Sequence, residues 1–465
     1  MYDSSLKRVG KINSHRFFVW LPLFMLQVYL TFTFVLFTSG PIKWPLENRT
    51  EVSILVFFYQ AMIILGYWFA VSRLKFYHAG WRGFDFADAL MRKYWLLLVL
   101  TFVALLIAHR NIAMTPSYLP TTLFSDFYRG LTNPLDAYLY KLSDQAKTNF
   151  SGQPLATALY GILIVCKVLL IAVLIEKWHQ ISSAKRVSGL FVSLFPIITA
   201  VSVGTNKPIF DLLFFYISIF FVSIICLPDD RIYKFIMARK TIVSVILFLL
   251  AFAPFYFQYT MSQRAPSLNP SGYVASEAPI KLSETFEEWC DSDEVYVAKA
   301  CSITSVTTNY LTQGYYGMSV SVDKPFETTY GVGSSVFLLE AFNKYLGIDL
   351  KPRTFQRKAS SQWSESQWHT VYTQVANDVG FVGVGLVMMV LGFISAAVWI
   401  SATIYRNLTA RCIVPLFVIM YLFIPANNQI FNMLETLCMF VILMAFWIAG
   451  FASRVAAGPR TASPG

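Results

Sequence analysis

One histidine in this chain lies where a long polar segment ends and a hydrophobic segment begins: His369, directly followed by Thr370. Histidine gains and loses a proton near neutral pH, so it can act as a general base. Near its end the polar segment carries four closely spaced cations, which are Lys351, Arg353, Arg357 and Lys358. A base next to a segment that can bind anions indicates transfer chemistry.

The elements that must position these residues are hydrophobic helices. The composition is 56% hydrophobic and only 14% charged, which is typical of a polytopic membrane protein and not of a soluble domain of 465 residues. We therefore predict an all-α fold with about ten transmembrane helices. The candidate spans are 17–37, 53–71, 94–109, 155–175, 189–203, 209–227, 241–259, 379–402, 412–426 and 430–451.

Lysine and arginine are concentrated at the N-terminus and in every second connection after it, so we expect both termini and these connections on the cytoplasmic side. The net charge of +11 follows from this topology and gives no indication of nucleic-acid binding. The first span is longer than the hydrophobic region of a signal peptide, so we expect it to remain as an anchor.

This topology divides the chain into four parts. We expect residues 1–259 to form helices one to seven with an outer loop at 110–154, and residues 260–378 to form a large outer loop with the catalytic elements and short amphipathic helices. Residues 379–453 form the last three helices. The tail at 454–465 is compatible with a cloning remnant, and we assign it no function.

The cysteines and histidines predict a disulfide and no metal site. Cys290 and Cys301 both lie in the large outer loop, where an oxidising environment favours a disulfide between them. The five histidines are scattered, and no cysteine or histidine spacing is typical of zinc. We therefore expect neither a metal nor another cofactor.

Two further features of the outer side could contact a substrate. Tyr315 and Tyr316 combine flat apolar faces with hydroxyl groups, which suits stacking on a sugar but equally suits a membrane interface. The turn at 204–208 places Lys207 at the start of the sixth span, where a helix N-terminus can hold phosphate; an interfacial lysine is the alternative interpretation. Residues 335–347 have apolar side chains at helical spacing, which predicts a packed helix.

The residues around His369 resemble a known signature. His369 and Thr370 are followed by nine residues and then by Gly380 and Gly383, which open a hydrophobic helix. This pattern, with several spans and one long outer loop before it, resembles the bacterial O-antigen ligase and O-antigen polymerase (Wzy) superfamily. Ligases of that family usually carry Asn, Ser or Gln where this chain has Thr370, which favours the polymerase branch.

The resemblance implies a metal-independent glycosyltransferase of the GT-C class in the bacterial inner membrane, with its active site facing the periplasm. Its substrate would be an oligosaccharide linked to undecaprenyl pyrophosphate. The protein would also contact membrane lipid, and a chain-length regulator of the Wzz type is a candidate partner. His369 would be the base. The pyrophosphate would be held by Arg264, which matches an arginine of the family, and by Lys207, Arg353 and Arg357.

Three alternatives stay open from the sequence. Asp378 either caps the eighth helix or orients a catalytic group. The enzyme could be an O-antigen ligase that transfers polysaccharide to lipid A-core instead of a polymerase. A polysaccharide or lipid transporter would instead use ionisable groups within its spans, for which Lys167, Asp211 and Glu435 are the candidates.

Overall fold

A computed structural model gives the fold of most of the chain. It describes residues 16–46, 48–74, 86–115, 118, 121–142, 154–225, 227, 229–264, 281–291, 294–365 and 367–456. These residues are almost entirely helical, and one pair of two-residue strands is formed among them. The backbone groups into two compact units, which are interleaved along the sequence.

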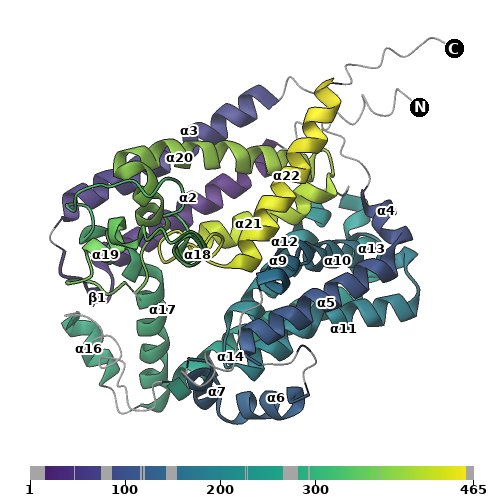
Figure 1. The fold of residues 1–465 in the computed structure, drawn as a ribbon, viewed down its shortest axis with the longest axis horizontal. Coiled ribbons are helices and arrows are strands. Elements are labelled where there is room, and N and C mark those ends of the chain that lie inside the picture. Colours follow the sequence, from purple (N-terminus) through teal and green to yellow (C-terminus); the bar gives the residue numbers. More distant parts are fainter. Residues whose placement is uncertain are drawn as a thin grey trace. The chain divides into compact units, whose positions relative to one another are not determined.

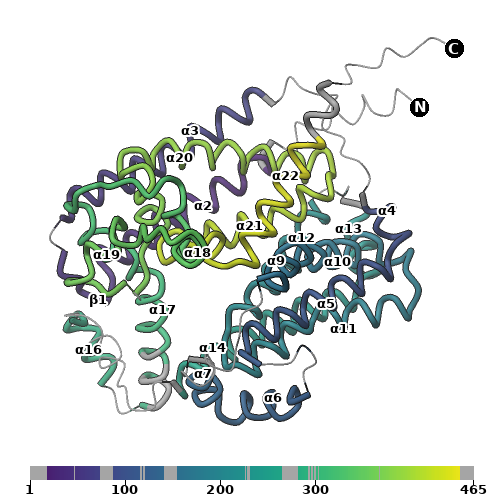
Figure 2. The backbone as a smooth tube through the Cα atoms, in the orientation of Figure 1, coloured from purple at the N-terminus to yellow at the C-terminus, as the bar shows by residue number. Residues whose placement is uncertain are grey.

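The first unit consists of residues 1–78, 268–400 and 420–433. Figures 1 and 2 show that it combines the purple N-terminal helices with green segments from the second half of the chain. Its elements are α2 (Arg16–Ser39), β1 (Ile42–Lys43), α3 (Arg49–Leu74), β2 (Lys281–Leu282), α16 (Glu284–Cys290), α17 (Val295–Ser319), α18 (Val336–Leu346), η3 (Lys351–Arg353), α19 (Phe355–Lys358) and most of α20 (Val371–Thr403).

The second unit consists of residues 79–267, 401–419 and 434–465. Its elements are α4 (Phe86–Arg92), α5 (Tyr94–Ala113), α6 (Leu123–Thr132), α7 (Pro134–Leu142), α9 (Pro154–Leu163), α10 (Val165–Glu176), η2 (Trp178–Gln180), α11 (Ser183–Ser202), α12 (Lys207–Ile225), α13 (Asp229–Ala238), α14 (Lys240–Arg264), most of α21 (Leu408–Leu422) and α22 (Leu434–Ala456). The hydrophobic helices α5, α10, α11 and α12 pack against one another in this unit.

Eight helical segments in the described residues are long and apolar enough to cross a membrane. They are Phe18–Ser39, Arg49–Arg73, Tyr94–Ala113, Pro154–Glu176, Ser183–Ser202, Lys207–Ile225, Lys240–Gln263 and Val371–Thr403. Two shorter apolar helices, Leu408–Leu422 and Leu434–Gly450, correspond to the last two spans expected from the sequence. The described residues are therefore compatible with an all-α, multi-pass membrane protein.

The helix that follows His369 begins earlier than its hydropathy indicates. The hydrophobic run starts at Val379, but α20 starts at Val371. Its first residues, from Val371 to Asn377, are buried although several are polar, because other segments of the first unit, among them α17 and the loop at 328–335, cover them. At Gly380 the backbone leaves the helical region, with φ 70° and ψ 162°, so α20 consists of a polar first piece and an apolar second piece.

Glycine also brings α20 close to α3, as the side-by-side ribbons in Figure 1 show. A Cβ atom at Gly66 of α3 would collide with the carbonyl oxygen of Met389, and one at Gly392 would collide with the carbonyl oxygen of Ile63. Glycines such as Gly380 and Gly383 can permit close contact between helices. The structure gives this role to Gly66 and Gly392 and gives Gly380 the helix break, because only glycine adopts its φ/ψ values readily.

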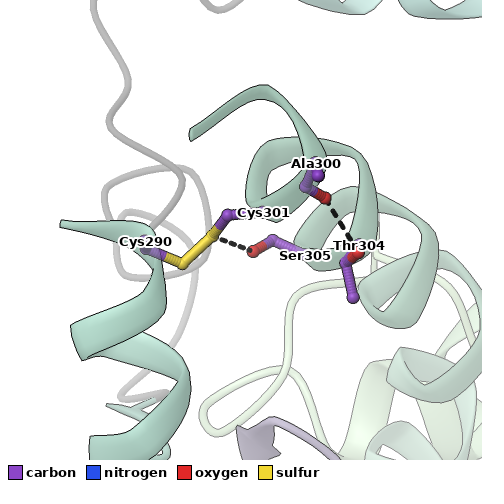
Figure 3. Close-up of a disulfide and its surroundings, with 5 residues drawn as sticks. All are labelled: Cys290, Ala300, Cys301, Thr304 and Ser305. Carbon is purple, nitrogen blue, oxygen red and sulfur yellow. Dashed lines mark hydrogen bonds between the residues drawn. A yellow bond between two sulfur atoms is a disulfide. The ribbon is translucent and has the colours of Figure 1, made fainter. Parts of the chain in front are cut away.

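The two cysteines of the outer loop that we expected to pair, Cys290 and Cys301, are joined by a disulfide, with 5.3 Å between their Cα atoms. Figure 3 shows that it links the last residue of α16 to α17, where the Cys301 sulfur lies 3.9 Å from the Ser305 hydroxyl oxygen. The disulfide closes a separation of 11 residues and thereby restricts α16 to the side of α17.

Ionisable side chains inside the second unit are paired. The Lys167 ammonium lies 2.6 Å from a Glu435 carboxylate oxygen, and the Tyr160 hydroxyl donates to the other oxygen at 2.9 Å. Arg411 forms an ion pair with Glu176. Because isolated charges are costly away from water, these partners explain how apolar helices can carry them.

The break in α20 gives a test. We expect Gly380→Ala to lower the unfolding midpoint in detergent, because an alanine at this φ/ψ costs about 1–3 kcal/mol. Gly450→Ala is the control, since a Cβ there meets nothing within 4 Å and the residue lies in a helix. Thermal unfolding of both variants checks this, and equal midpoints would contradict the assigned strain.

Candidate functional site

The segment that carries His369 lies directly on helix α17. The Thr370 amide donates to the carbonyl oxygen of Gly314 at 3.3 Å, and a Cβ at Gly314 would collide with the backbone of Pro425. A Cβ at Gly317, one turn further along, would lie 2.7 Å from Nδ1 of His369. Both glycines of the sequence Gly314-Tyr315-Tyr316-Gly317 are therefore needed for this close approach.

His369 is almost fully buried, with 1% of its surface exposed. Neither ring nitrogen has a hydrogen-bond partner in the described part of the chain. Trp363 lies beside the same glycine as the imidazole, and its indole N–H donates to the carbonyl oxygen of Trp368 at 3.0 Å, which fixes the segment before His369. The ring is thus enclosed between α17 and the segment from Trp363 to Trp368.

Burial lowers the pKa of His369 from 6.5 to about 4, because the apolar surroundings penalise the charged imidazolium. The backbone groups of Ser364 and Gly317 lie near the ring without meeting the geometry of a hydrogen bond to it, and together with the charge of Glu365 they oppose this effect only in part. His369 is consequently neutral at physiological pH. A neutral imidazole is the form that can accept a proton.

Thr370 starts the helix that follows. Its hydroxyl accepts from the Thr373 amide at 3.1 Å, which is the hydrogen bond of a helix N-cap. This explains physically why a small polar residue follows the histidine, since Ser, Thr and Asn all cap helices well. The cap fixes the direction in which α20 leaves the histidine.

Asn377 connects α20 to the cation segment, residues 351–358. Its side-chain oxygen accepts from the Phe355 amide at 2.8 Å, and its amide nitrogen donates to Gln356 and to the carbonyl oxygen of Gly333, each at 3.0 Å. Its backbone oxygen accepts from the amide of Thr329 at 3.0 Å. One buried side chain thus fixes the cation segment relative to the helix that follows His369.

Asp378 binds the glycine loop, which comprises residues 328–335. Its carboxylate accepts from the backbone amides of Gly331, Gly333 and Ser334, each at 2.9 Å, and from the hydroxyl groups of Thr329 and Ser334. We expected it to cap the eighth helix or to orient a catalytic group. Because it lies inside α20, it does not cap the start of that helix, and its carboxylate accepts hydrogen bonds from a neighbouring loop. A role in orienting a catalytic group stays a prediction.

The cation segment is partly neutralised. Arg357 and Lys351 both pair with Glu365, and Lys358 pairs with Glu327 at 2.9 Å. For Glu365, burial acts to raise the pKa, but the hydrogen bonds and charges of Arg357 and Lys351 outweigh it and leave the pKa lowered.

Arg353 differs from these three cations, because it forms no ion pair in the described part of the chain. Its guanidinium donates to the Tyr330 hydroxyl at 3.3 Å and to the Thr328 carbonyl oxygen at 3.4 Å.

Tyr315 and Tyr316 belong to the core of the first unit. Tyr315 is fully buried among Phe34 and Phe37 of α2, and its hydroxyl lies 3.3 Å from that of Thr33. Tyr316 is 5% exposed and stacks on Trp44. In this conformation neither ring face is open, so both residues act in core packing, and sugar stacking stays a prediction from the sequence.

The remaining candidates, Lys207 and Arg264, belong to the second unit. Lys207 is the first residue of α12 and pairs with Asp211 at 2.5 Å. The nearby amides of Gly204, Thr205, Ile209 and Phe210 all have backbone partners, so few donors remain there for a phosphate. Arg264 ends α14, and its side chain lies outside the described residues.

Within the described residues, no three His, Cys, Asp or Glu side chains are grouped so that they could hold a metal ion. Comparison of the chain with models of protein families, with curated proteins and with solved structures finds no match. The evidence for a function therefore comes from this geometry and from the resemblance in the sequence.

Several residues of the site were missed at the level of sequence. Gly314 and Gly317 carried a signal, because small residues three apart on a helix permit close approach of another segment. Asn377 and Trp363 carried none, since one polar residue in a helix and one tryptophan in a loop are common. Their roles depend on which segments meet in the fold.

The burial of His369 predicts a pH dependence. The unfolded chain binds a proton at a pKa of 6.5 and the folded chain at about 4, so stability falls as the pH drops through this window. The full loss is on the order of 3 kcal/mol. We expect His369→Gln to have a shallower fall of the unfolding midpoint between pH 6.5 and 4.5. Identical slopes in the two proteins would contradict the neutral buried imidazole.

Proposed function

We propose that this chain is a membrane-embedded glycosyltransferase that polymerises oligosaccharide repeat units linked to undecaprenyl pyrophosphate. It would transfer the growing chain to a sugar hydroxyl of an incoming unit, as part of the synthesis of O-antigen or a related surface polysaccharide. The resemblance of the segment from His369 to Gly383 supports this proposal. So does a set of apolar helices suited to a lipid-linked substrate.

One observation carries the proposal: the buried, neutral His369 has no hydrogen-bond partner for either ring nitrogen in the described part of the chain. Buried polar groups without partners are uncommon in folded proteins, because each costs the free energy of its lost hydration. A substrate hydroxyl that donates to this imidazole would supply the missing partner. The site would then hold the group from which it must remove a proton.

In the proposed reaction, the hydroxyl oxygen of the incoming unit attacks the anomeric carbon of the growing chain. The bond between that carbon and the diphosphate oxygen breaks, and the hydroxyl proton passes to His369. Because the imidazole is enclosed, the segment from Trp363 to Trp368 must move to admit the hydroxyl. Such a movement would also exclude water from the reacting carbon when the segment closes.

The departing diphosphate requires positive charge. Arg353 is the best candidate in the first unit, because it has no carboxylate partner among the described residues. Arg357 would have to exchange Glu365 for phosphate, and Lys207 would have to leave Asp211. Arg264 is retained on the resemblance alone. Each of these side chains is a candidate to bind the diphosphate in place of a divalent metal.

The proposal places the protein in the bacterial inner membrane with its site on the periplasmic face, where a chain-length regulator could bind. An O-antigen ligase would use the same base and cations with a different acceptor. The transporter alternative is weaker, because Lys167 and Asp211 each have an ion-pair partner within the second unit. Paired charges favour a structural role over a conduction path.

The base is tested first. In proteoliposomes with purified lipid-linked repeat units, we expect His369→Ala to lose more than about 100-fold of the polymerisation rate, which is typical for removal of a general base. His179→Ala is the matched control, because His179 is exposed in the short helix η2. Near-normal polymerisation by His369→Ala would refute the assigned base.

The cations give a second test. We expect Arg264→Lys and Arg353→Lys to slow polymerisation about tenfold or more, because an ammonium keeps the charge but loses the planar fork that spans two phosphate oxygens. Arg357→Lys should cost less, because Glu365 already engages this residue. Activity should survive EDTA. Unchanged rates in all three variants, or loss with EDTA that Mg²⁺ restores, would rule out diphosphate binding without a metal.

A further inference from the structure

The glycine loop, residues 328–335, presents one aromatic side chain in an unusual way. Tyr330 is 70% exposed and has φ 58°, in the left-handed region that residues other than glycine seldom adopt. The next residue, Gly331, has φ 90°, and a Cβ there would meet nothing within 4 Å. The loop therefore holds a large ring in open space on a strained backbone.

This strain is maintained by Asp378. The carboxylate binds residues on both sides of Tyr330, namely Thr329 and Gly331, as well as Gly333 and Ser334. The Tyr330 amide also donates to the Thr328 hydroxyl at 3.1 Å. Hydrogen bonds to a charged acceptor are stronger than neutral ones, so this set can hold a residue whose backbone would otherwise relax.

Arg353 joins the tyrosine from the cation segment. Its guanidinium carbon lies 5.5 Å from the centroid of the Tyr330 ring, and it donates to the Tyr330 hydroxyl at 3.3 Å. In the described part of the chain it makes no hydrogen bond through Nε or the second terminal nitrogen. The pair thus combines an exposed flat ring with a cation whose donors are available.

We propose that the ring of Tyr330, oriented by Arg353 and held in position by Asp378, forms a binding platform for a pyranose ring of the acceptor oligosaccharide. The apolar C–H face of a sugar packs against an aromatic ring. The identity of this ligand rests on the proposed function. In this conformation the rings of Tyr315 and Tyr316 are buried, whereas that of Tyr330 is open.

The position of Asp378 in α20 fits an acceptor oligosaccharide that extends beyond the reacting sugar. Asp378 lies seven residues after Val371, the first residue of α20, which is about 10 Å along the helix axis. His369 lies just before that first residue. A sugar on the platform would therefore be a ring other than the one that carries the attacking hydroxyl, and its binding would affect affinity more than the rate of the chemical step.

Tyr345, another exposed tyrosine of the first unit, provides a comparison with Tyr330. It is 59% exposed on α18, and the Lys344 ammonium lies 5.5 Å from its ring centroid. Its backbone is helical and no loop supports it. An aromatic residue at a membrane interface needs no left-handed backbone, so the geometry of Tyr330 indicates a more specific role than that of Tyr345.

The experiment measures oligosaccharide binding without turnover. The probe is the reducing oligosaccharide released by mild acid from the lipid-linked pool of the cell, titrated into detergent-solubilised full-length protein and followed by saturation-transfer NMR. We expect Tyr330→Ala to weaken binding about tenfold and Tyr330→Phe to retain it within about threefold, because the ring face remains. Tyr345→Ala should bind as the wild type does. Asp378→Asn should weaken binding and speed hydrogen exchange at residues 331–334.

The outcomes separate this inference from the proposed function. Equal binding by the wild type and Tyr330→Ala, or no binding by the wild type, would overturn the platform. Tyr330-dependent binding without polymerisation in proteoliposomes would support the platform and refute the polymerase. In proteoliposomes that do polymerise, Tyr330→Ala should raise the KM for the acceptor about tenfold while kcat changes little. A fall in kcat at unchanged KM would also overturn the assignment.

Discussion

Asn377 and Asp378, two adjacent side chains in the first piece of α20, form hydrogen bonds with the backbone of two neighbouring segments, the cation segment and the glycine loop. Asn377 binds the cation segment and the glycine loop, and Asp378 binds the glycine loop alone. Without these acceptors, several amides would be left without partners, at about 1–3 kcal/mol for each buried group. The arrangement of Arg353, Tyr330 and the residues around His369 depends on this pair.

The pair can act in this way because α20 is divided. A continuous apolar helix would have to place Asn377 and Asp378 at the edge of its hydrophobic surface. The break at Gly380 instead separates a buried polar piece, which the outer-loop segments surround, from the apolar piece that follows. Gly314 and Gly317 complement the break on α17, because they let the start of α20 lie against that helix. The close approach of α17 and the start of α20 thus encloses His369.

Charged side chains differ between the two units in whether they have ion-pair partners. Inside the second unit, Lys167 and Glu435 are held together at 2.6 Å, as an apolar environment requires. In the first unit, the cations lie on segments nearer to water, and Glu365 neutralises two of them while Arg353 has no carboxylate partner among the described residues. A cation that a nearby tyrosine orients, and that no acid neutralises, is suited to an exchangeable ligand.

Hydropathy by itself determined the hydrophobic helices, since a run of about 20 apolar residues has few alternatives to a spanning helix. The helix at 335–347 was predictable from its spacing, and α18 occupies that position with Ser335 as its N-cap. The position of His369 before a hydrophobic helix was also visible, but the start of that helix at Val371 was not. The roles of the polar residues were not. Tertiary packing buried Tyr315 and Tyr316, exposed Tyr330 and assigned Asp378 to a loop. Each outcome depends on contacts between residues that are 23 to 282 positions apart in the sequence.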